Sequence, residues 1–280
     1  TLVDSKTNDT TPTVSGTGTP GDTITVKDAA GNVIATATVA SNGTWTATPT
    51  TALPEGLNTL AITATDPAGN TGPATALPVT IDTTGPAAPA AALASVSDSG
   101  KLGDNTTTDT TPTLSGTGMP GDTITVKNAA GTVIATATVA GDGTWTATPT
   151  TALPEGVNAL SITATDAAGN TGAATALPIT IDTTAPAAPV AALALVSDTG
   201  TVGDSTTSDN TPTLSGTGTP GDTITIKDAA GNVIATAVVA ANGSWTATTS
   251  TLPDGVNALS VTATDPAGNT SAPTALPITV

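Results

Sequence analysis

The chain has 280 residues, and its 22 acidic side chains against 5 basic ones give a formal net charge of −17. Nucleic acids and anionic membranes are bound through basic patches, so this balance argues against both as partners and favours metal cations. The chain contains no cysteine, histidine, arginine, tyrosine or phenylalanine, which excludes disulfides, thiolate and imidazole metal ligands, and the usual histidine general base. No apolar run reaches the roughly 18 residues that span a bilayer, so no membrane insertion is expected in this segment.

The first segment that recurs is the Thr-rich stretch 11–18, which returns at 111–118 and at 211–218. The single tryptophan of each copy, first at Trp45, keeps the same spacing of 100 residues. This period is longer than the roughly 20–50 residues of solenoid and propeller repeats, and it matches the size of one small sandwich domain. We therefore expect three domains, the first trimmed at its N-terminal end and the third at its C-terminal end. They cover residues 1–82, 83–182 and 183–280.

Within the second copy, segments that alternate threonine with apolar residues are separated by Pro-Gly and Asp-Gly turn signals. The predicted strands, in chain order, are 111–117, 123–127, 133–139, 144–148, 157–165 and 176–181. This pattern makes about seven short strands per repeat, as an immunoglobulin-like sandwich requires, and no segment has the 3.6-residue apolar period of a helix. The expected fold class is all-β, with three tandem immunoglobulin-like β-sandwich domains in an extended rod on the order of 100 Å long or more.

Strand alternation also predicts which side chains face inward. Ile124 and Val126 share one face of their strand, as do Leu160, Ile162 and Ala164 on a later one. The one tryptophan of each domain is expected to pack in the core rather than to form a sugar-stacking platform, because no other aromatic residue accompanies it. The lysine that recurs at positions 27, 127 and 227 is expected to face solvent on a sheet edge, where it would discourage strand pairing.

Each boundary between copies carries a connector that contains two prolines, first at residues 82–89 and followed by an Ala-rich stretch. Because proline restricts the backbone, we expect this connector to be stiff.

Aspartates concentrate around the connectors. Two of the 22 acidic residues are glutamates, so 20 are aspartates, the residue that favours turns and serves as a short oxygen ligand for calcium. Two unit charges about 4 Å apart repel by roughly 4 kcal/mol at an effective dielectric near 20, and a calcium ion with about six to eight oxygen ligands would remove that cost. The alternative is that these aspartates only cap turns and keep the surface soluble. The candidate calcium ligands are Asp66, Asp82, Asp98, Asp104 and Asp109 at the first boundary, and Asp166, Asp182, Asp198, Asp204 and Asp209 at the second.

One set of motifs recurs in every copy and resembles a known family. The set runs Thr-Pro-Thr-Leu-Ser-Gly-Thr-Gly, Pro-Gly-Asp, Asp-Gly-Thr-Trp, Leu-Pro-Glu-Gly, Ala-Thr-Asp-Ala-Ala-Gly-Asn and Ile-Asp-Thr-Thr-Ala-Pro, as read in the second copy. It resembles the bacterial immunoglobulin-like repeats of giant biofilm-associated (Bap-type) and RTX-type adhesins, and the resemblance covers the whole chain.

The resemblance implies an extracellular or bacterial cell-surface protein that is exported by type I secretion and serves in surface attachment and biofilm formation. It implies an extender (stalk) role, with calcium at the junctions bound by the aspartates named above. The expected partners are calcium ions and neighbouring repeats of the same chain, in a monomeric rod without enzymatic activity. The alternative is a module that binds a carbohydrate or another adhesin copy directly. The copies differ mainly by small exchanges, such as Asn32 to Thr132, which favours the extender.

Overall fold

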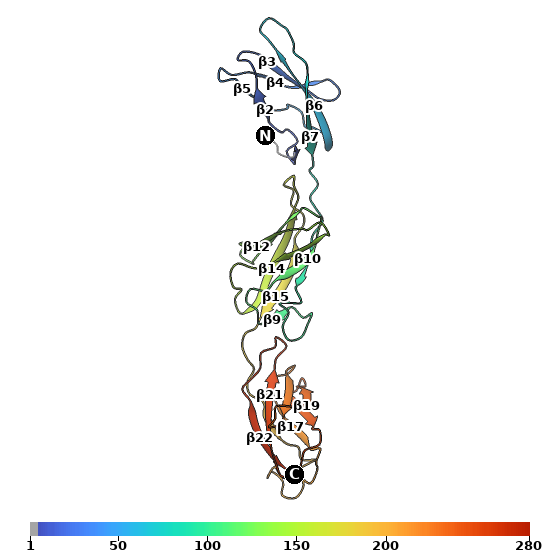
Figure 1. Cartoon of the computed structure of the whole chain (residues 1–280), viewed down its shortest axis with the longest axis vertical. Helices are drawn as coiled ribbons and strands as arrows, with labels where there is room; N and C mark the ends of the chain where they lie inside the picture. Colours follow the sequence, from blue (N-terminus) through green and yellow to red (C-terminus); the bar gives the residue numbers. More distant parts are fainter. Residues whose placement is uncertain (1–4) are drawn as a thin grey trace.

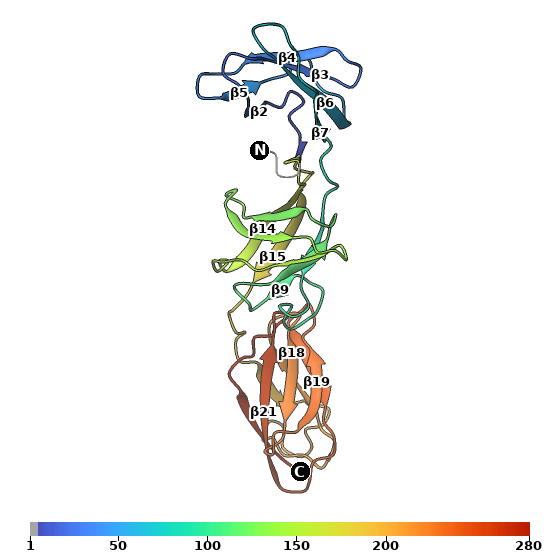
Figure 2. The same cartoon turned by 45° about the horizontal axis from the view of Figure 1, so that its top comes forward.

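The computed structural model describes residues 5–280, and these form strands, turns and loops without any helix. Figures 1 and 2 show three β-sandwiches arranged end to end along one long axis, here called domains 1, 2 and 3 in chain order. Each consists of two sheets, so the predicted all-β, immunoglobulin-like class is confirmed. Among the described residues, no helix has the length and apolar character that crossing a membrane requires.

The described part of domain 1 has one five-stranded and one two-stranded sheet. Its strands are β1 (Lys6–Thr7), β2 (Val14–Thr17), β3 (Thr23–Lys27), β4 (Val33–Thr38), β5 (Thr44–Ala47), β6 (Gly56–Thr65) and β7 (Thr75–Ile81). The larger sheet has the order β1-β7-β6-β3-β4, and β2 pairs with β5. All neighbours are antiparallel except β1, which runs parallel to β7.

Domain 2 repeats this arrangement with one strand more. Its strands are β8 (Ala90–Leu93), β9 (Thr106–Thr107), β10 (Leu114–Thr117), β11 (Thr123–Lys127), β12 (Val133–Thr138), β13 (Thr144–Ala147), β14 (Gly156–Thr165) and β15 (Thr175–Ile181). The sheets have the orders β12-β11-β14-β15-β9 and β13-β10-β8. The short strand β9 runs parallel to the end of β15.

Domain 3 has the same two sheets, with the orders β19-β18-β21-β22 and β16-β17-β20. Its strands are β16 (Val190–Leu193), β17 (Thr213–Thr217), β18 (Thr223–Lys227), β19 (Val233–Val238), β20 (Ser244–Thr248), β21 (Val256–Thr264) and β22 (Thr274–Thr279). A single parallel bridge between Thr206 and Thr279 stands where domain 2 has the β9–β15 pair.

The core of each sandwich lies between its two sheets. In domain 2 the five side chains predicted to face inward are all buried, which confirms the strand alternation; they are Ile124, Val126, Leu160, Ile162 and Ala164. Trp145 packs in the same cluster with only 3% of its surface exposed, so its predicted place in the core is also confirmed. The aliphatic and aromatic side chains that alternate with threonine therefore supply the burial that holds the sheets together.

The connector is shorter than the sequence pattern indicates. That pattern assigns residues 90–93 to the Ala-rich part of the connector, and this assignment is wrong. They form β8, which pairs antiparallel with β10 and places Leu93 opposite Leu114. Three consecutive alanines give neither the alternation nor the β-branched side chains that mark a strand, so the pairing depends on the open edge of β10.

The recurring lysine faces solvent in domains 2 and 3 but does not lie on a sheet edge. Lys127 ends β11, which pairs with β12 on one side and β14 on the other. Strand alternation places its side chain on the face opposite the buried Val126. Lys127 and Lys227 are exposed and Lys27 is partly buried. The predicted edge position is therefore wrong, because this strand is an interior one in every copy.

Candidate functional site at the domain junctions

The connectors lie against the domain that follows them. We define junction 1 as the connector 82–89 together with segment 166–175 of domain 2. Junction 2 is the connector 182–189 together with segment 265–274 of domain 3.

At junction 1 two side chains of domain 2 hold the connector at its beginning and its end. Asn170 Nδ2 donates a hydrogen bond to the carbonyl oxygen of Asp82 at 2.7 Å, and Thr175 Oγ1 donates to that of Pro89 at 2.6 Å. The same two bonds recur at junction 2, at 2.8 Å and 2.6 Å. The connector therefore has a fixed course, as its prolines predict.

A glutamate of the preceding domain holds the start of each connector. The carboxylate of Glu155 accepts hydrogen bonds from the backbone N of Thr183 at 3.1 Å and from its Oγ1 at 2.9 Å. Glu55 binds Thr83 in the same way. The hydrogen bonds from Thr183 lower the pKa of Glu155, so this carboxylate is ionised at neutral pH.

Gly172 lets the connector of junction 1 approach domain 2 closely. A Cβ atom added at Gly172 would lie 2.1 Å from the carbonyl oxygen of Pro86. The equivalent Gly72 in domain 1 has no such neighbour, because the nearest atom to its added Cβ is Ala64 O at 3.8 Å. Replacement of Gly172 therefore tests whether the connector is docked.

We expect Gly172→Ala to displace the connector of junction 1 and to loosen the orientation of domains 1 and 2, because Pro86 must move away. The measurement is the distance distribution between spin labels on Cys residues introduced at Thr36 and Thr136, both exposed, in a chain that has no cysteine of its own. The distribution should broaden, whereas Gly72→Ala should leave it unchanged. A distribution that stays narrow in Gly172→Ala would show that the connector is not held at this point.

The loop that carries Asn170 is a five-residue motif, Asp-x-Ala-Gly-Asn, which domains 1 and 3 use twice and domain 2 uses once, because residues 128–132 read Asn-Ala-Ala-Gly-Thr. In one copy Asp166 Oδ1 accepts a hydrogen bond from the backbone N of Asn170 at 2.9 Å, and Oδ2 accepts one from Asn170 Nδ2 at 2.9 Å. Asp66 and Asn70 do the same in domain 1. Burial works to raise the pKa of Asp166, but the hydrogen bonds from Asn170 outweigh it and lower the pKa.

The second use of this motif has the same hydrogen bonds in a hairpin away from the junctions. In the hairpin between β3 and β4, Asp28 Oδ1 accepts from the backbone N of Asn32 at 2.8 Å, and Oδ2 accepts from Asn32 Nδ2 at 2.9 Å. This hairpin is exposed, and the hydrogen bonds from Asn32 lower the pKa of Asp28. The turn-capping alternative therefore accounts for the local geometry of Asp66 and Asp166.

Asp122 and Asp222 occupy the junctions, although neither is in the predicted set of ligands. They follow Pro-Gly in the turn before β11 and before β18. Only 5% of Asp122 and 2% of Asp222 is exposed, and Oδ2 of each carboxylate is buried without a hydrogen-bond partner. Asp22, at the same place in domain 1, is only partly buried. The same turn is therefore less buried in domain 1 than in domains 2 and 3, where it lies at a junction.

Other carboxylates surround these buried groups. Burial raises the pKa of Asp222, and the negative charges of Asp265 and Asp182 raise it further, against a hydrogen bond from Thr219 that lowers it. Burial and the charge of Asp166 likewise raise the pKa of Asp122. A carboxylate with one oxygen buried and without a hydrogen-bond partner, among like charges, is a group that a bound cation would stabilise.

The predicted grouping of five aspartates at each boundary is wrong, because the structure places these residues at different ends of the domains. Asp82 lies at junction 1 and Asp182 at junction 2. Asp66 lies at the opposite end of domain 1 from Asp82, because β6 begins beside Ile81 and Asp66 follows its other end. Asp166 is therefore at junction 1 rather than junction 2.

The loop that contains Asp98 and Asp104 also lies one junction further along the chain than expected. The backbone N of Lys101 donates to Pro266 O at 2.8 Å, and Ser99 Oγ donates to Ala267 O at 2.5 Å, so this loop of domain 2 contacts domain 3. The parallel pairing of β9 with the end of β15 brings the loop to this end of the sandwich. Sequence proximity to the first boundary is misleading here, because the chain crosses the domain before the loop begins.

In domain 3, Asp198, Asp204 and Asp209 likewise lie at the other end of the domain from the one predicted. The backbone N of Thr207 donates to Thr279 O at 2.8 Å, so their loop lies at the end of domain 3 away from junction 2.

Within both loops most carboxylate oxygens cap turns. Asp104 Oδ1 accepts from the backbone N of Thr106, and Asp109 accepts from the backbone N of Thr111 and from Ser97 Oγ. The exceptions are Asp98 and Asp198, in each of which Oδ1 is buried without a partner. In residues 5–280 no three acidic side chains converge on one point as a ready metal site. Metal binding by the predicted set therefore stays a prediction.

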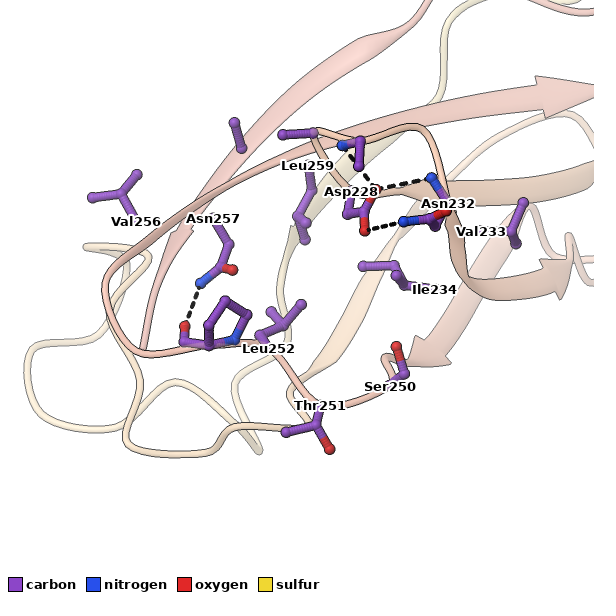
Figure 3. Close-up of a pocket in the computed structure, with 14 residues that line it drawn as sticks. Asp228, Asn232, Val233, Ile234, Ser250, Thr251, Leu252, Val256, Asn257 and Leu259 are labelled. Atoms are coloured by element: carbon purple, nitrogen blue, oxygen red, sulfur yellow. Dashed lines mark hydrogen bonds between the residues drawn. The ribbon is translucent and has the colours of Figure 1, made fainter.

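Figure 3 shows a different kind of feature, a groove in domain 3 between the β18–β19 turn and the β20–β21 loop. Its lining includes exposed Val233 and Val256 and no aromatic residue. The carboxylate of Asp228 turns to its own loop, where it accepts from the backbone N of Asn232 at 2.8 Å and from Asn232 Nδ2 at 3.0 Å. The groove therefore lacks an aromatic platform on which a sugar ring could stack.

Comparisons with known proteins identify the repeat. The family model of the bacterial Ig-like domain matches the chain three times, over residues 2–83, 85–183 and 184–280. No curated protein matches.

Among solved structures, the chain is similar to one from work on host-cell-surface retention of a 1.5-MDa bacterial ice-binding adhesin, with 23% identity over 99% of this chain and 93% of the other and a TM-score of 0.36. It is similar to the BSP domain of a biofilm-associated protein, with 18% identity over 91% of this chain and 56% of the other and a TM-score of 0.26. Fibronectin(III)-like modules of CbhA from Clostridium thermocellum match with 18% identity over 68% of this chain and 94% of the other, at a TM-score of 0.40.

Proposed function

Because the chain belongs to the family of bacterial Ig-like domains, matched over almost its whole length, we propose that it is an extender segment of a bacterial surface adhesin, stiffened by calcium at its domain junctions. The segment holds other parts of an extracellular or cell-surface protein away from the cell, in surface attachment and biofilm formation. It performs no chemical reaction. The motif resemblance to Bap-type and RTX-type repeats supports this role and export by type I secretion.

The connectors carry the mechanical part of the proposal. Each is fixed to the following domain by hydrogen bonds at both of its ends and to the preceding domain by a glutamate. A connector held in this way transmits the orientation of one sandwich to the next. Three sandwiches in line with docked connectors (Figure 2) form a spacer rather than a set of independent modules.

The buried carboxylates support the calcium part of the proposal. This part depends most on the burial of Asp222 Oδ2. At junction 2 the ion would bind at the buried Asp222 oxygen, where the nearby charges of Asp182 and Asp265 also attract a cation. Their oxygen donors are those that calcium prefers, and an ion of charge +2 supplies the compensation that Asp222 lacks among its neighbours. Asp98, with its own buried oxygen, lies in the loop that contacts domain 3 and is a further donor for junction 2.

Small-angle scattering of the full chain tests this function. In calcium we expect the pair-distance distribution of a straight rod, and in a chelator we expect a shorter maximum dimension because the freed joints bend. Magnesium is the control, since it demands a tighter octahedral shell and keeps several waters. Scattering curves that coincide with and without chelator would contradict the calcium part and leave the fold unaffected.

Direct ligand binding by each domain is the alternative function. It would be favoured by an exposed aromatic side chain, whereas the three tryptophans are buried and the groove of domain 3 has no aromatic residue. The described surface therefore favours the extender.

A further inference from the structure

The two junctions have different charges at one repeat-equivalent position. Lys6 of β1 lies opposite Thr80, two residues before Asp82, and its Nζ is 3.1 Å from Asp82 Oδ2. In domain 2 the parallel strand β9 has Thr106 at the equivalent position, opposite Thr180. Junction 1 thus contains an ammonium group beside its connector carboxylate, and junction 2 has a neutral hydroxyl there.

The ammonium of Lys6 also acts across the junction. Its positive charge opposes the effect of Asp166 on the Asp122 carboxyl, so it lies close enough to influence a buried group of domain 2. Asp122 lacks the hydroxyl that Thr219 provides to Asp222, because Met119 occupies that place in domain 2. At junction 1 the compensation therefore comes from Lys6, whereas Asp222 faces Asp182 and Asp265 with no lysine among the charges that act on it.

Lys101 is the basic residue nearest to junction 2. It lines a shallow cavity with Asp265 and Pro266, and its side chain is exposed. Its backbone N is bound to Pro266 O, but its charge is not among those that act on the Asp222 carboxyl. It therefore does not replace Lys6 at the buried centre of junction 2.

We propose that the Lys6 ammonium takes at junction 1 the place of the divalent cation that junction 2 binds, so that the two joints of one rod differ in their dependence on calcium. This inference rests on the proposed function, because it needs junction 2 to bind the ion. The salt bridge keeps domains 1 and 2 aligned when calcium is removed. The joint between domains 2 and 3 loosens, since three carboxylates there have no compensating cation.

Two pairs of spin labels in the full chain report on the two junctions separately. Labels at positions 36 and 136 report junction 1, and labels at positions 136 and 236, which is also an exposed threonine, report junction 2. In the unsubstituted background, removal of calcium with a chelator should broaden the second distance distribution by at least twofold and leave the first unchanged.

Exchange of the two residues tests the role of the lysine. Lys6→Thr should make junction 1 broaden in chelator and narrow again with calcium, and Thr106→Lys should keep junction 2 narrow without calcium. Both residues occur naturally at this position in one of the copies, so each variant is expected to fold. Lys27→Thr removes the same charge away from the junctions and should change neither distribution.

The possible outcomes test the inference separately from the proposed function on which it rests. If junction 2 responds to calcium but junction 1 remains independent of calcium in Lys6→Thr, the lysine has no such role and the inference is overturned while calcium binding stands. If junction 2 does not respond, calcium stiffening itself is wrong and the inference falls with it. Narrowing of junction 2 by Thr106→Lys in chelator supports the exchange of an ion for a lysine directly.

Discussion

Replacement of Asp222 by asparagine is expected to change the stability of the chain in opposite directions with and without calcium. In chelator the variant should be more stable than the unsubstituted chain, by about 1–3 kcal/mol, because it removes a buried charge that faces Asp182 and Asp265. In calcium it should be less stable, because a ligand is lost; an ion at a hundred times its dissociation constant contributes about 2.7 kcal/mol. Calorimetric unfolding in each condition measures both effects.

The pKa of Asp222 fixes the sign of the effect of pH in chelator. Its value is raised above the ordinary 3.8. The protonated carboxyl therefore favours the docked state, and this contribution is complete below the ordinary pKa and lost as the pH rises through the raised value. Without calcium, junction 2 should tighten on acidification, and Asp222→Asn should abolish that trend.

Asp22 provides the matched control for this experiment. It occupies the same Pro-Gly-Asp turn in domain 1, and no other domain of this chain covers it. Asp22→Asn should shift the unfolding midpoint equally in calcium and in chelator. Equal shifts for Asp22→Asn and Asp222→Asn would mean that the turn alone determines the effect and that the junction holds no ion.

Gly116→Ala is expected to destabilise domain 2 by about 3 kcal/mol or more. The added Cβ would lie 1.9 Å from Ala90 O of β8 and 2.7 Å from Cζ2 of Trp145. The backbone of β8 on one side and the indole ring on the other leave no direction in which it can relax. In domains 2 and 3 this glycine is required because a neighbouring backbone and the indole ring both approach it.

Hydrogen exchange of peptides from domain 2 measures this loss of stability locally. Substitution of two other glycines shows how the loss depends on the space around the added Cβ. Gly16→Ala meets only the Trp45 ring, at 2.7 Å, so its effect on domain 1 should be smaller. Gly141→Ala has no atom within 4 Å of the added Cβ and should be neutral. Loss of protection of the same size at all three positions would exclude close packing as the cause.

The regular part of the fold follows directly from the sequence. The segment 123–127 alternates threonine with Ile124 and Val126, and the structure makes it a strand with the same bounds. Such alternation is visible because the period of a strand is independent of its partners. Residues 90–93 show the opposite case, since three alanines and a leucine become a strand only because β10 offers an unpaired edge.

The candidate site was less predictable because it depends on how two domains meet. Composition indicates that aspartates gather at the junctions, and Asp82 and Asp182 do lie there. Asp122 follows Pro-Gly in a turn and is indistinguishable in sequence from Asp22, although a neighbouring domain buries only the former. The one available signal was that the Pro-Gly-Asp turn keeps its aspartate in all three copies, whereas Asp28 becomes Asn128 in the other turn.

The parallel pairing of β9 with β15 determines how each domain carries tension. A pull along the rod leaves domain 2 through the C-terminal end of β15 and enters it at β8, which pairs with β10, so β9 is drawn toward the opposite end once β8 has detached. The bonds from Thr180 N to Asn105 O and from Asp182 N to Thr107 O lie across the direction of pull, so they are loaded in shear and must break together. An antiparallel hairpin pulled from its open end would instead unzip one bond at a time. Domains 1 and 2 thus carry this mechanical latch at the strand that leads to the next domain.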